Sequence, residues 1–474
     1  MIERILQLAI RHRGTLASAI LVVGTGCVSY RPEPLDERAL LHELQAIRLE
    51  AVRAGVQDAL SPGQPVARAG DATRALSSDE AVAVALFLNP ALRATRKQRG
   101  VAEGELVSAG LLSNPAISAS WMHIQDFTAD FASGLLDLGA RWVPPRPGEI
   151  DAKKALARAR LDEVRAEVSA AEWQVATDVR KAHLGVLIAA EQLHLAGGLL
   201  KLQERVRQFI RDKRSLGDAT DLDASFAEVE HASALQGREL AVTELERARQ
   251  ALNTLLGLPP LAEVELAAGS ELPEPDPSIL DPRHLEELML EHRPEIAAVR
   301  SAYREAEQRL RLACLASWPW FGVGPQYERD AGDGSSTVNK LGAGVDLDLP
   351  ILNYNQGEIA ILEADRARLR EEFRARVYRG QTELNEALRS LRAQHRLIAI
   401  YRDTVQPALD ENARLTEAGV ALGNFNLVQL IATQDKALRT RREFLSARLE
   451  LGSALFELER SLGERLSDLD SEKE

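Results

Sequence analysis

The amino-acid sequence predicts a mainly α-helical protein that also contains four short β-strands. Residues 149–257 contain no proline and few glycines, a composition that favours very long helices. A similar run returns over residues 357–463, and each run is divided by a turn glycine, Gly217 or Gly423. Short segments in which apolar residues alternate with Gly, Asp or Arg precede both runs. We therefore expect two long helical hairpins, each following a pair of strands.

The composition is typical of long helices and argues against several functions. Of the 474 residues, 58 are basic and 71 are acidic, and this balance disfavours a general nucleic-acid-binding role. Aromatic residues make up only 4% of the chain, while Ala, Leu, Glu and Arg dominate. The two cysteines, Cys27 and Cys314, lie far apart without metal-ligand spacing. Neither a disulfide framework nor a zinc site is indicated.

Residues 1–26 have the features of a targeting signal. Three early arginines precede a short apolar segment, Leu16–Val23, which is shorter than the roughly 20 residues that a membrane-spanning helix needs. The segment resembles a bacterial lipoprotein signal, in which Cys27 would carry the lipid anchor. It departs from that pattern at Gly24, where Leu or Val is usual. An ordinary secretory signal cleaved nearby is the alternative, and residues 27–77 are expected to form a tether.

Prolines and glycines indicate an internal repeat. Pro90 and Pro294 are 204 positions apart, and the turn glycines Gly217 and Gly423 are 206 apart. Each repeat is expected to contain a helix interrupted near its proline, two strands and a long helical hairpin. The expected boundaries are 78–257 for repeat 1, 258–280 for a proline-rich linker, 281–463 for repeat 2 and 464–474 for an acidic tail.

Apolar residues within the long runs recur at every third or fourth position, as at Val164, Val168, Ala171 and Val175. This spacing predicts a seam along which helices pack, as in coiled coils. A helix of about 65 residues would be roughly 100 Å long at 1.5 Å per residue. Pro407 should kink the second long helix or loosen one of its turns. On periodicity alone, a soluble coiled-coil rod or dimer would explain this spacing about equally well.

The short alternating segments distinguish between these architectures. Within residues 341–349 the odd positions are apolar and the even positions are Gly or Asp, and residues 136–142 alternate similarly. Strands of about ten residues with one apolar and one polar face are typical of transmembrane β-barrels. A small soluble sheet packed on the helices is the alternative. The expected partner strands are 115–124 and 319–327, with hairpin loops at 125–133 and 328–338.

A four-stranded membrane sheet must close with other copies, because unpaired strand edges are not tolerated in hydrocarbon. Two copies give eight strands and a filled interior, whereas three copies give twelve strands and an open lumen. The polar strand face would then line water, with Asp137, Arg141, Asp346 and Asp348 as candidate lumen residues. Four tryptophans lie in or beside the strands, where an interfacial girdle is expected: Trp121, Trp142, Trp318 and Trp320.

Several segments together carry a family resemblance. They are Asn89-Pro90-Ala91-Leu92, Leu112-Ser113-Asn114-Pro115, Leu349-Pro350-Ile351-Leu352-Asn353 and the hairpin at Gly423. In their order and spacing the chain resembles the TolC-type outer-membrane factor family, and its Asn-Pro pairs are most similar to the CzcC-like heavy-metal branch.

This resemblance implies a homotrimer in which twelve strands form a β-barrel in the outer membrane. The helical hairpins would form a trimeric α-barrel in the periplasm, surrounded by an equatorial collar of terminal and linker segments. It also implies a passive exit duct that receives substrates from a periplasmic adaptor protein and an inner-membrane pump, commonly a proton-driven RND pump. No cofactor is implied.

The hairpin turns would then form the periplasmic tip. Some relatives carry acidic residues six and nine positions beyond the second turn glycine, where this chain has Gln429 and Ala432. Asp218, Asp221 and Asp223 instead follow the first turn glycine, and three copies would create a negative constriction. Asp is also a favoured turn and N-cap residue, so capping is the alternative. The full set of candidate tip residues is Gly217, Asp218, Asp221, Asp223, Gly423, Asn424, Asn426 and Gln429.

The sequence does not predict an enzyme. It contains no nucleophile elbow, Walker loop, dinucleotide fingerprint or zinc spacing. His284 and His292 lie near glutamates but are eight positions apart, about two helical turns, which argues against a shared metal site. The sequence therefore predicts an export duct, with heavy-metal cations as candidate cargo. The alternatives are a duct for drugs or polypeptides, and a soluble coiled-coil scaffold.

Overall fold

The computed structural model describes residues 29–47, 75–126, 131–267, 280–331, 337–421 and 427–466. The chain divides into two units, residues 1–47 and residues 48–474. In the first unit, α3 (Glu37–Ala46) begins after Asp36, whose carboxylate accepts hydrogen bonds from the N–H groups of Arg38 and Ala39. No residue of α3 is buried. The second unit contains all the remaining described elements.

Each repeat of the second unit begins with two helices separated at a proline. Repeat 1 has α5 (Ser78–Leu88) and α6 (Pro90–Ala109), and repeat 2 has α9 (Pro282–His292) and α10 (Pro294–Ala316). Because proline has no N–H group and disfavours a helical residue before it, one helix ends and the next begins there. The side chain of Asn89 also accepts a hydrogen bond from the N–H of Leu92, which caps α6.

The four strands form one antiparallel sheet with the order β1-β2-β3-β4. They are β1 (Ala116–Asp126), β2 (Phe131–Arg141), β3 (Trp320–Ala331) and β4 (Thr337–Asp348). The strands extend further than the sequence predicted, so the expected loops at 125–133 and 328–338 were too long. Polar residues such as Glu328 led to that error. In the sheet Glu328 lies opposite Lys340 and pairs with it at 3.0 Å.

Each repeat ends in a long helical hairpin. In repeat 1, α7 (Glu149–Ser215) returns as α8 (Asp221–Leu256). In repeat 2 the first arm consists of α11 (Gln356–Ile400), a π-helical turn η1 (Tyr401–Val405) and α12 (Gln406–Ala421), and the second arm is α13 (Leu427–Leu462). The π-helical turn ends at Val405, two residues before Pro407, which confirms the expected local disturbance of this helix.

The two repeats share one joint between their short and long helices. α8 and α13 are both 36 residues long, and each ends at a glycine with positive φ, 74° at Gly257 and 78° at Gly463. A Cβ atom at Gly257 would lie 2.9 Å from the carbonyl oxygen of Leu88, at the end of α5. A Cβ atom at Gly463 would lie 2.6 Å from that of His292, at the end of α9. Both positions therefore require glycine.

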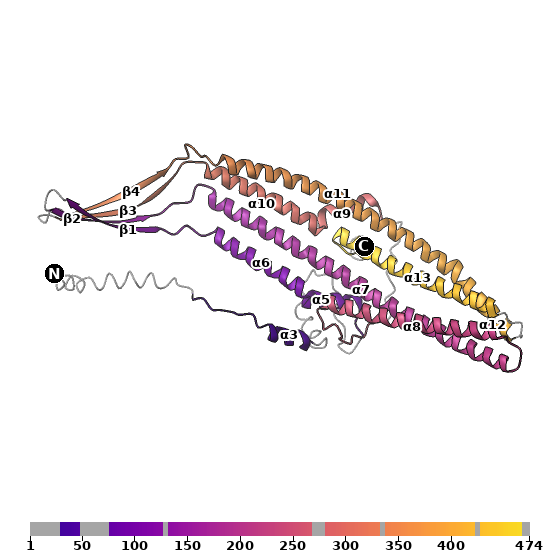
Figure 1. Ribbon diagram of the computed structural model, residues 1–474. Coiled ribbons are helices and arrows are strands. Elements are labelled where there is room, and N and C mark those ends of the chain that lie inside the picture. Colours follow the sequence, from indigo (N-terminus) through magenta and orange to yellow (C-terminus); the bar gives the residue numbers. More distant parts are fainter. Residues whose placement is uncertain are drawn as a thin grey trace. The chain divides into compact units, whose positions relative to one another are not determined.

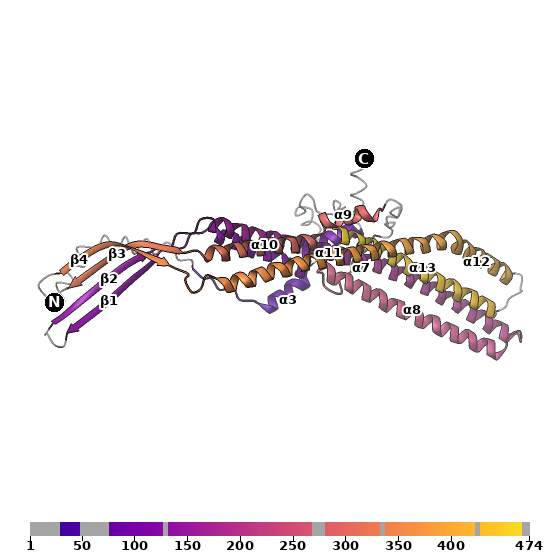
Figure 2. The ribbon, with the colours of Figure 1, turned by 90° about the horizontal axis from the view of Figure 1, so that it is seen from above.

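Within the second unit the sheet lies at one end, and the tips of the hairpins lie at the other (Figures 1 and 2). The long helices run side by side between them, with α7 in contact with α5, α6, α8, α10 and α13. A buried apolar cluster joins α9, α10, α11 and α13 around Met289, Ile296, Leu384 and Leu458. α7 is the one helix of the described residues that is long and apolar enough to cross a membrane. Five helices contact α7 along its length.

Candidate functional site

The sheet has one polar and one apolar face. Strand pairing places the even-numbered residues of β1, β3 and β4 on the same face as the odd-numbered residues of β2. This polar face carries Ser118, Ser120, Asp137, Arg141, Gln326, Glu328, Lys340, Asp346 and Asp348. The opposite face carries Ile117, Trp121, Leu136, Leu138, Phe321, Val323, Leu341, Val345 and Leu347. Such an arrangement suits a sheet between water and hydrocarbon.

All four candidate lumen residues lie on the polar face. The guanidinium Nε of Arg141 lies 3.1 Å from a carboxylate oxygen of Asp346, two strands away. Arg141 crosses β3 at Gly322, where a Cβ atom would lie 2.8 Å from that Nε. The side-chain amide of Gln326 donates a hydrogen bond to Asp137 at 2.9 Å. Asp348 lies opposite Trp320 at the helical end of the sheet.

The tryptophans are divided between two levels of the sheet. Trp142, Trp318 and Trp320 lie at the helical end, where the indole of Trp142 donates to the Ser113 carbonyl at 3.1 Å. The indole of Trp320 donates to the Pro144 carbonyl at 2.6 Å. Trp121 lies in the middle of β1 and is 70% exposed. Trp142, Trp318 and Trp320 thus lie at one level of the sheet, but Trp320 lies opposite Asp348 on the polar face. Trp121 lies on the apolar face, nearer the middle of the sheet.

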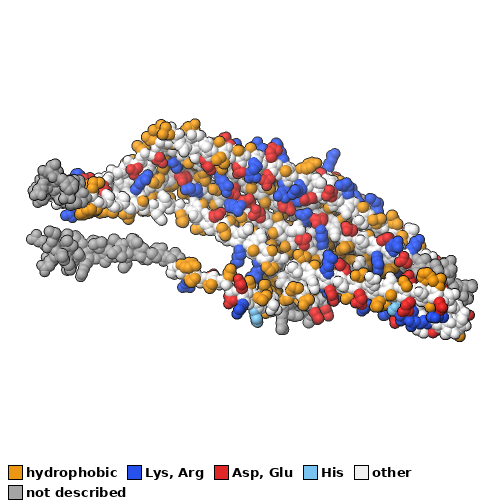
Figure 3. All heavy atoms as spheres, viewed as in Figure 1, with side chains coloured by type: hydrophobic (Ala, Val, Ile, Leu, Met, Phe, Trp, Pro, Cys, Tyr) orange, Lys and Arg blue, Asp and Glu red, His pale blue; other side chains and the backbone are white. Residues whose placement is uncertain are grey.

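At the tip of the first hairpin, the three aspartates have local partners. Asp218 lies 3.7 Å from the ammonium of Lys213, and Asp221 lies 2.8 Å from the guanidinium of Arg214. Asp223 forms a capping box with Thr220, and these hydrogen bonds hold the pKa of Asp223 below its ordinary value. Acidic and basic side chains lie together over this end of the molecule (Figure 3).

Gly217 has a positive φ of 82°, as a tight turn requires. Cys27, Gly423, Asn424 and Asn426 lie outside the described residues, and Gln429 lies in the first turn of α13. All three aspartates of the predicted negative constriction lie in the described part of the chain. In one copy Lys213 and Arg214 partly neutralise Asp218 and Asp221.

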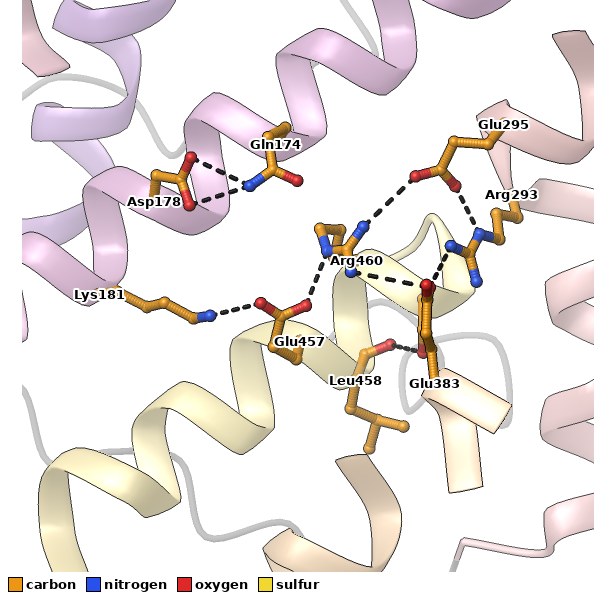
Figure 4. Close-up of polar contacts among 10 residues, drawn as sticks. Gln174, Asp178, Lys181, Arg293, Glu295, Glu383, Glu457, Leu458 and Arg460 are labelled. Carbon is orange, nitrogen blue, oxygen red and sulfur yellow. Dashed lines mark hydrogen bonds and ion pairs between the residues drawn. The ribbon is translucent and has the colours of Figure 1, made fainter. Parts of the chain in front are cut away.

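A network of ion pairs between the repeats was not predicted from the sequence (Figure 4). Arg460 of α13 contacts Glu457 at 2.7 Å, Glu295 of α10 at 3.4 Å and Glu383 of α11 at 3.8 Å. Lys181 of α7 pairs with Glu457, and Arg293 pairs with both Glu295 and Glu383. The network joins four helices beside the cluster around Met289. No sequence motif marks it, because its directly paired members are up to 276 positions apart.

A second group is more deeply buried. The guanidinium of Arg180 donates to Glu459 at 2.7 Å, and their side chains are 7% and 9% exposed. Burial raises the pKa of Glu459 and lowers the pKa of Arg180, although the two groups attract each other. Asp79 of α5 lies 3.7 Å from Arg180 and 2.6 Å from Arg465. This group fastens α5 and α7 of repeat 1 to the end of α13 in repeat 2.

Glu305 of α10 is buried against α7. Burial, together with a hydrogen bond to the carboxyl of Glu163, raises the pKa of Glu305 to about 7, despite its ion pair with Arg309. Arg160 pairs with Glu163 at 2.6 Å from the other side. The carboxyl of Glu305 is therefore partly protonated near neutral pH.

The histidines considered as metal ligands are not brought together. His292 lies 3.3 Å from Glu464, beyond α13, while His284 lies at the opposite end of α9. No group of three potential ligands occurs among the residues that the structure describes.

Comparisons with known proteins agree with this architecture. Residues 285–464 match the family model described as outer membrane efflux protein. The chain is 26% identical over 314 residues to the cobalt-zinc-cadmium resistance protein CzcC of Cupriavidus metallidurans, covering 65% of this chain and 71% of that protein.

Among solved structures, the outer-membrane channel OprN has a TM-score of 0.67 at 19% identity, over 81% of this chain and 89% of OprN. The MtrE outer membrane channel of Neisseria gonorrhoeae has a TM-score of 0.64 at 19% identity, over 82% of this chain and 89% of MtrE. The matches confirm both the TolC-type resemblance and the expected fold class.

Proposed function

We infer that this chain, which has the TolC-type fold and matches the outer membrane efflux protein family over most of repeat 2, forms the exit duct of a tripartite efflux system in the outer membrane. The observation that carries the inference is the two-faced sheet with unpaired outer edges. Within the described residues neither β1 nor β4 has a second partner strand. Such edges are stable in a membrane only when other copies pair with them.

Three copies give twelve strands, enough for an open lumen lined by Asp137, Arg141, Asp346 and Asp348. The apolar face would contact lipid, with Trp142 and Trp318 near one membrane surface and Cys27 as an additional lipid anchor. Trp320 lies opposite Asp348 and would share the water-facing side of the sheet. The long hairpins would form the wall of a tube in the periplasm. Substrates would pass without an energy input from this protein, because energy and selectivity come from an inner-membrane pump of the RND type.

The hairpin tips would bind a periplasmic adaptor protein. The similarity to CzcC, which is a cobalt-zinc-cadmium resistance protein, favours divalent metal cations as cargo. Lumen carboxylates would tolerate such cargo, although each copy also places Arg141 against Asp346.

Reconstitution of the purified protein in planar lipid bilayers tests the duct directly. We expect trimers in detergent and a passive, ohmic conductance in the bilayer. A mature protein that is fully soluble and monomeric without detergent would rule out the channel. Co-expression with a metal-efflux pump and adaptor in a host lacking its own duct tests the cargo, since zinc or cobalt resistance should then depend on this chain.

A further inference from the structure

An open hollow of about 690 Å³ lies where β4 ends and α11 begins. Its wall is formed by Arg146, Ala316, Trp318, Asp348, residues 349–353 and Asn355. The apolar side chains of the connection 349–355 face outward, with Ile351 77% and Leu352 92% exposed. Hydrophobic side chains gather over this part of the surface (Figure 3). Adjacent exposed apolar residues of this kind mark an interaction surface.

A second exposed apolar pair lies in the connection between α6 and β1. Leu111 is 66% exposed and Leu112 is 59% exposed. The next residue is held in place, because the Ser113 hydroxyl donates to the Val143 carbonyl at 2.9 Å and the Ser113 carbonyl accepts from the indole of Trp142. The two leucines therefore extend from a fixed backbone.

The directions of the strands determine which connections meet when copies join. Ala116 pairs with Arg141, and Trp320 pairs with Asp348, so these four residues lie at the helical end of the sheet. β1 runs away from the helices, and β4 runs back toward them. An antiparallel pair between β4 of one copy and β1 of the next therefore places the connection after β4 beside the connection before β1.

The seam between the two repeats inside one chain shows the same kind of contact. There the connection after β2 meets the connection before β3. The indole of Trp320 donates to the Pro144 carbonyl at 2.6 Å, and the guanidinium of Arg146 lies 5.6 Å from the centre of the Trp320 ring. Arg146 also donates to the Trp318 carbonyl at 3.4 Å. The internal seam is thus polar and aromatic, whereas the residues available for the outer seam are aliphatic.

We propose that Leu111 and Leu112 of one copy pack against the exposed side chains of Leu349, Ile351 and Leu352 of the neighbouring copy. The occupant is a second copy of this chain, because strand direction brings these two connections together and both are apolar. Pairing must also match even-numbered residues of β4 with even-numbered residues of β1, so that polar and apolar faces continue around the barrel. The proposal rests on the proposed function, since it requires the sheet to close.

Cross-linking in assembled trimers tests the contact. Leu112→Cys and Ile351→Cys are combined in a Cys314→Ser background, because Cys314 is exposed. A bismaleimide with a spacer of about 10 Å is then added to the purified full-length protein. We expect cross-linked dimers and trimers but no larger species, at least about tenfold above either single variant, since the contact raises the effective thiol concentration. The matched control pairs Ile351→Cys with Leu240→Cys, which is 63% exposed on α8; it should give the background yield.

Three outcomes would overturn the proposal. The 112/351 pair could cross-link no better than the control. Ile351→Cys could react fully with a water-soluble maleimide in the trimer, which would place it in water. It could also react in detergent but be shielded only in phospholipid vesicles, which would make lipid the occupant.

A second variant separates assembly from folding. Leu352→Ser changes a side chain that is 92% exposed in one chain, so the helical content of the monomer should not change. The trimer should dissociate at a lower temperature on semi-native gels. If trimers form and conduct but positions 112 and 351 of neighbouring copies do not cross-link above the control, this proposal is wrong and the proposed function stands. If no trimer forms, the proposed function falls as well.

Discussion

At the residue scale, two buried sets of ionisable side chains, the pair Arg180–Glu459 and Glu305 with its neighbours, lie between helices of the bundle. Arg180 and Glu459 are almost inaccessible to water, and their attraction must offset the loss of hydration. Glu305 has the opposite character, because its burial favours the protonated form. Both groups join helices that are distant in the sequence, so each makes a separate prediction about stability.

Removing one member of the Arg180–Glu459 pair should destabilise the protein more than removing both. Arg180→Met leaves a buried carboxylate without its cation and should cost about 3–5 kcal/mol. The double variant Arg180→Met with Glu459→Leu should recover most of that loss. Thermal unfolding in detergent, followed by circular dichroism, gives the coupling from the four variants. Arg99→Ala breaks an exposed pair on α6 and should cost less than about 1 kcal/mol. Strictly additive effects at 180 and 459 would contradict this interpretation.

Glu305 should make stability fall as pH rises toward neutrality. Its pKa in the folded protein, about 7, lies above the ordinary value of 4.5, so its contribution is fully present below pH 4.5 and is lost as pH rises through 7. Glu305→Gln removes the titration and should gain up to about 3 kcal/mol relative to the wild type between pH 4.5 and pH 8. Unfolding midpoints measured across this range provide the test. Glu307→Gln, two positions along α10, should keep the wild-type pH dependence.

The aspartates at the tip make a prediction about permeation. Three copies of Asp218 and Asp221 would favour cations, although Lys213 and Arg214 reduce the effect. Changing both aspartates to asparagine keeps the capping box of Asp223 and should lower the cation-to-anion permeability ratio severalfold. Reversal potentials in a salt gradient measure this ratio. An unchanged ratio would leave these residues with turn and capping roles only, and Asp435→Asn on α13 is the control.

At the scale of elements, glycines allow neighbouring strands to approach. A Cβ atom at Gly324 of β3 would lie 1.6 Å from the carbonyl oxygen of Ala140, where β2 and β3 meet. Gly342 of β4 has no atom within 4 Å of its Cβ position. The seam between the repeats therefore depends on one glycine and not on the other.

Gly324→Ala should separate β2 from β3 and prevent stable trimers, whereas Gly342→Ala should assemble normally. The clash involves backbone atoms, which cannot move aside as a side chain can. The yield of heat-modifiable trimer in the outer-membrane fraction compares the two variants. Equal yields would show that the strands can shift without cost.

The sequence predicted elements better than contacts. Proline and glycine spacing predicted the breaks at Pro90 and Pro294, the hairpin turn at Gly217 and the disturbed turn before Pro407, because those residues act on the local backbone. Alternation placed Asp137 and Asp346 on one face for the same local reason. The partners of Arg460 and Glu305 could not be predicted, because they depend on how distant helices align. The last residues of β3, from Glu328 onward, were expected to form a loop, because polar residues on the water-facing side of a strand are also common in loops.

At the scale of the whole molecule, the duplication relates two halves that are matched in length but not in chemistry. The joints at Gly257 and Gly463 are nearly identical, whereas the connections at the base of the sheet differ. An aromatic and arginine contact fixes the seam inside the chain, and leucines remain at the outer edge. In the proposed trimer, the duplicated fold would thus distinguish a permanent internal seam from one that forms only when copies meet.

The alternating direction of the four strands also bears on stoichiometry. Because β1 and β4 run in opposite directions, a ring of any number of copies can close with antiparallel pairs alone. The hydrogen-bonding pattern of the sheet therefore does not select three copies over four. In the proposed duct, we expect that choice to depend on the angle at which hairpins of neighbouring copies pack. In the proposed duct, the bore of the membrane pore would then be set by helices that lie outside the bilayer.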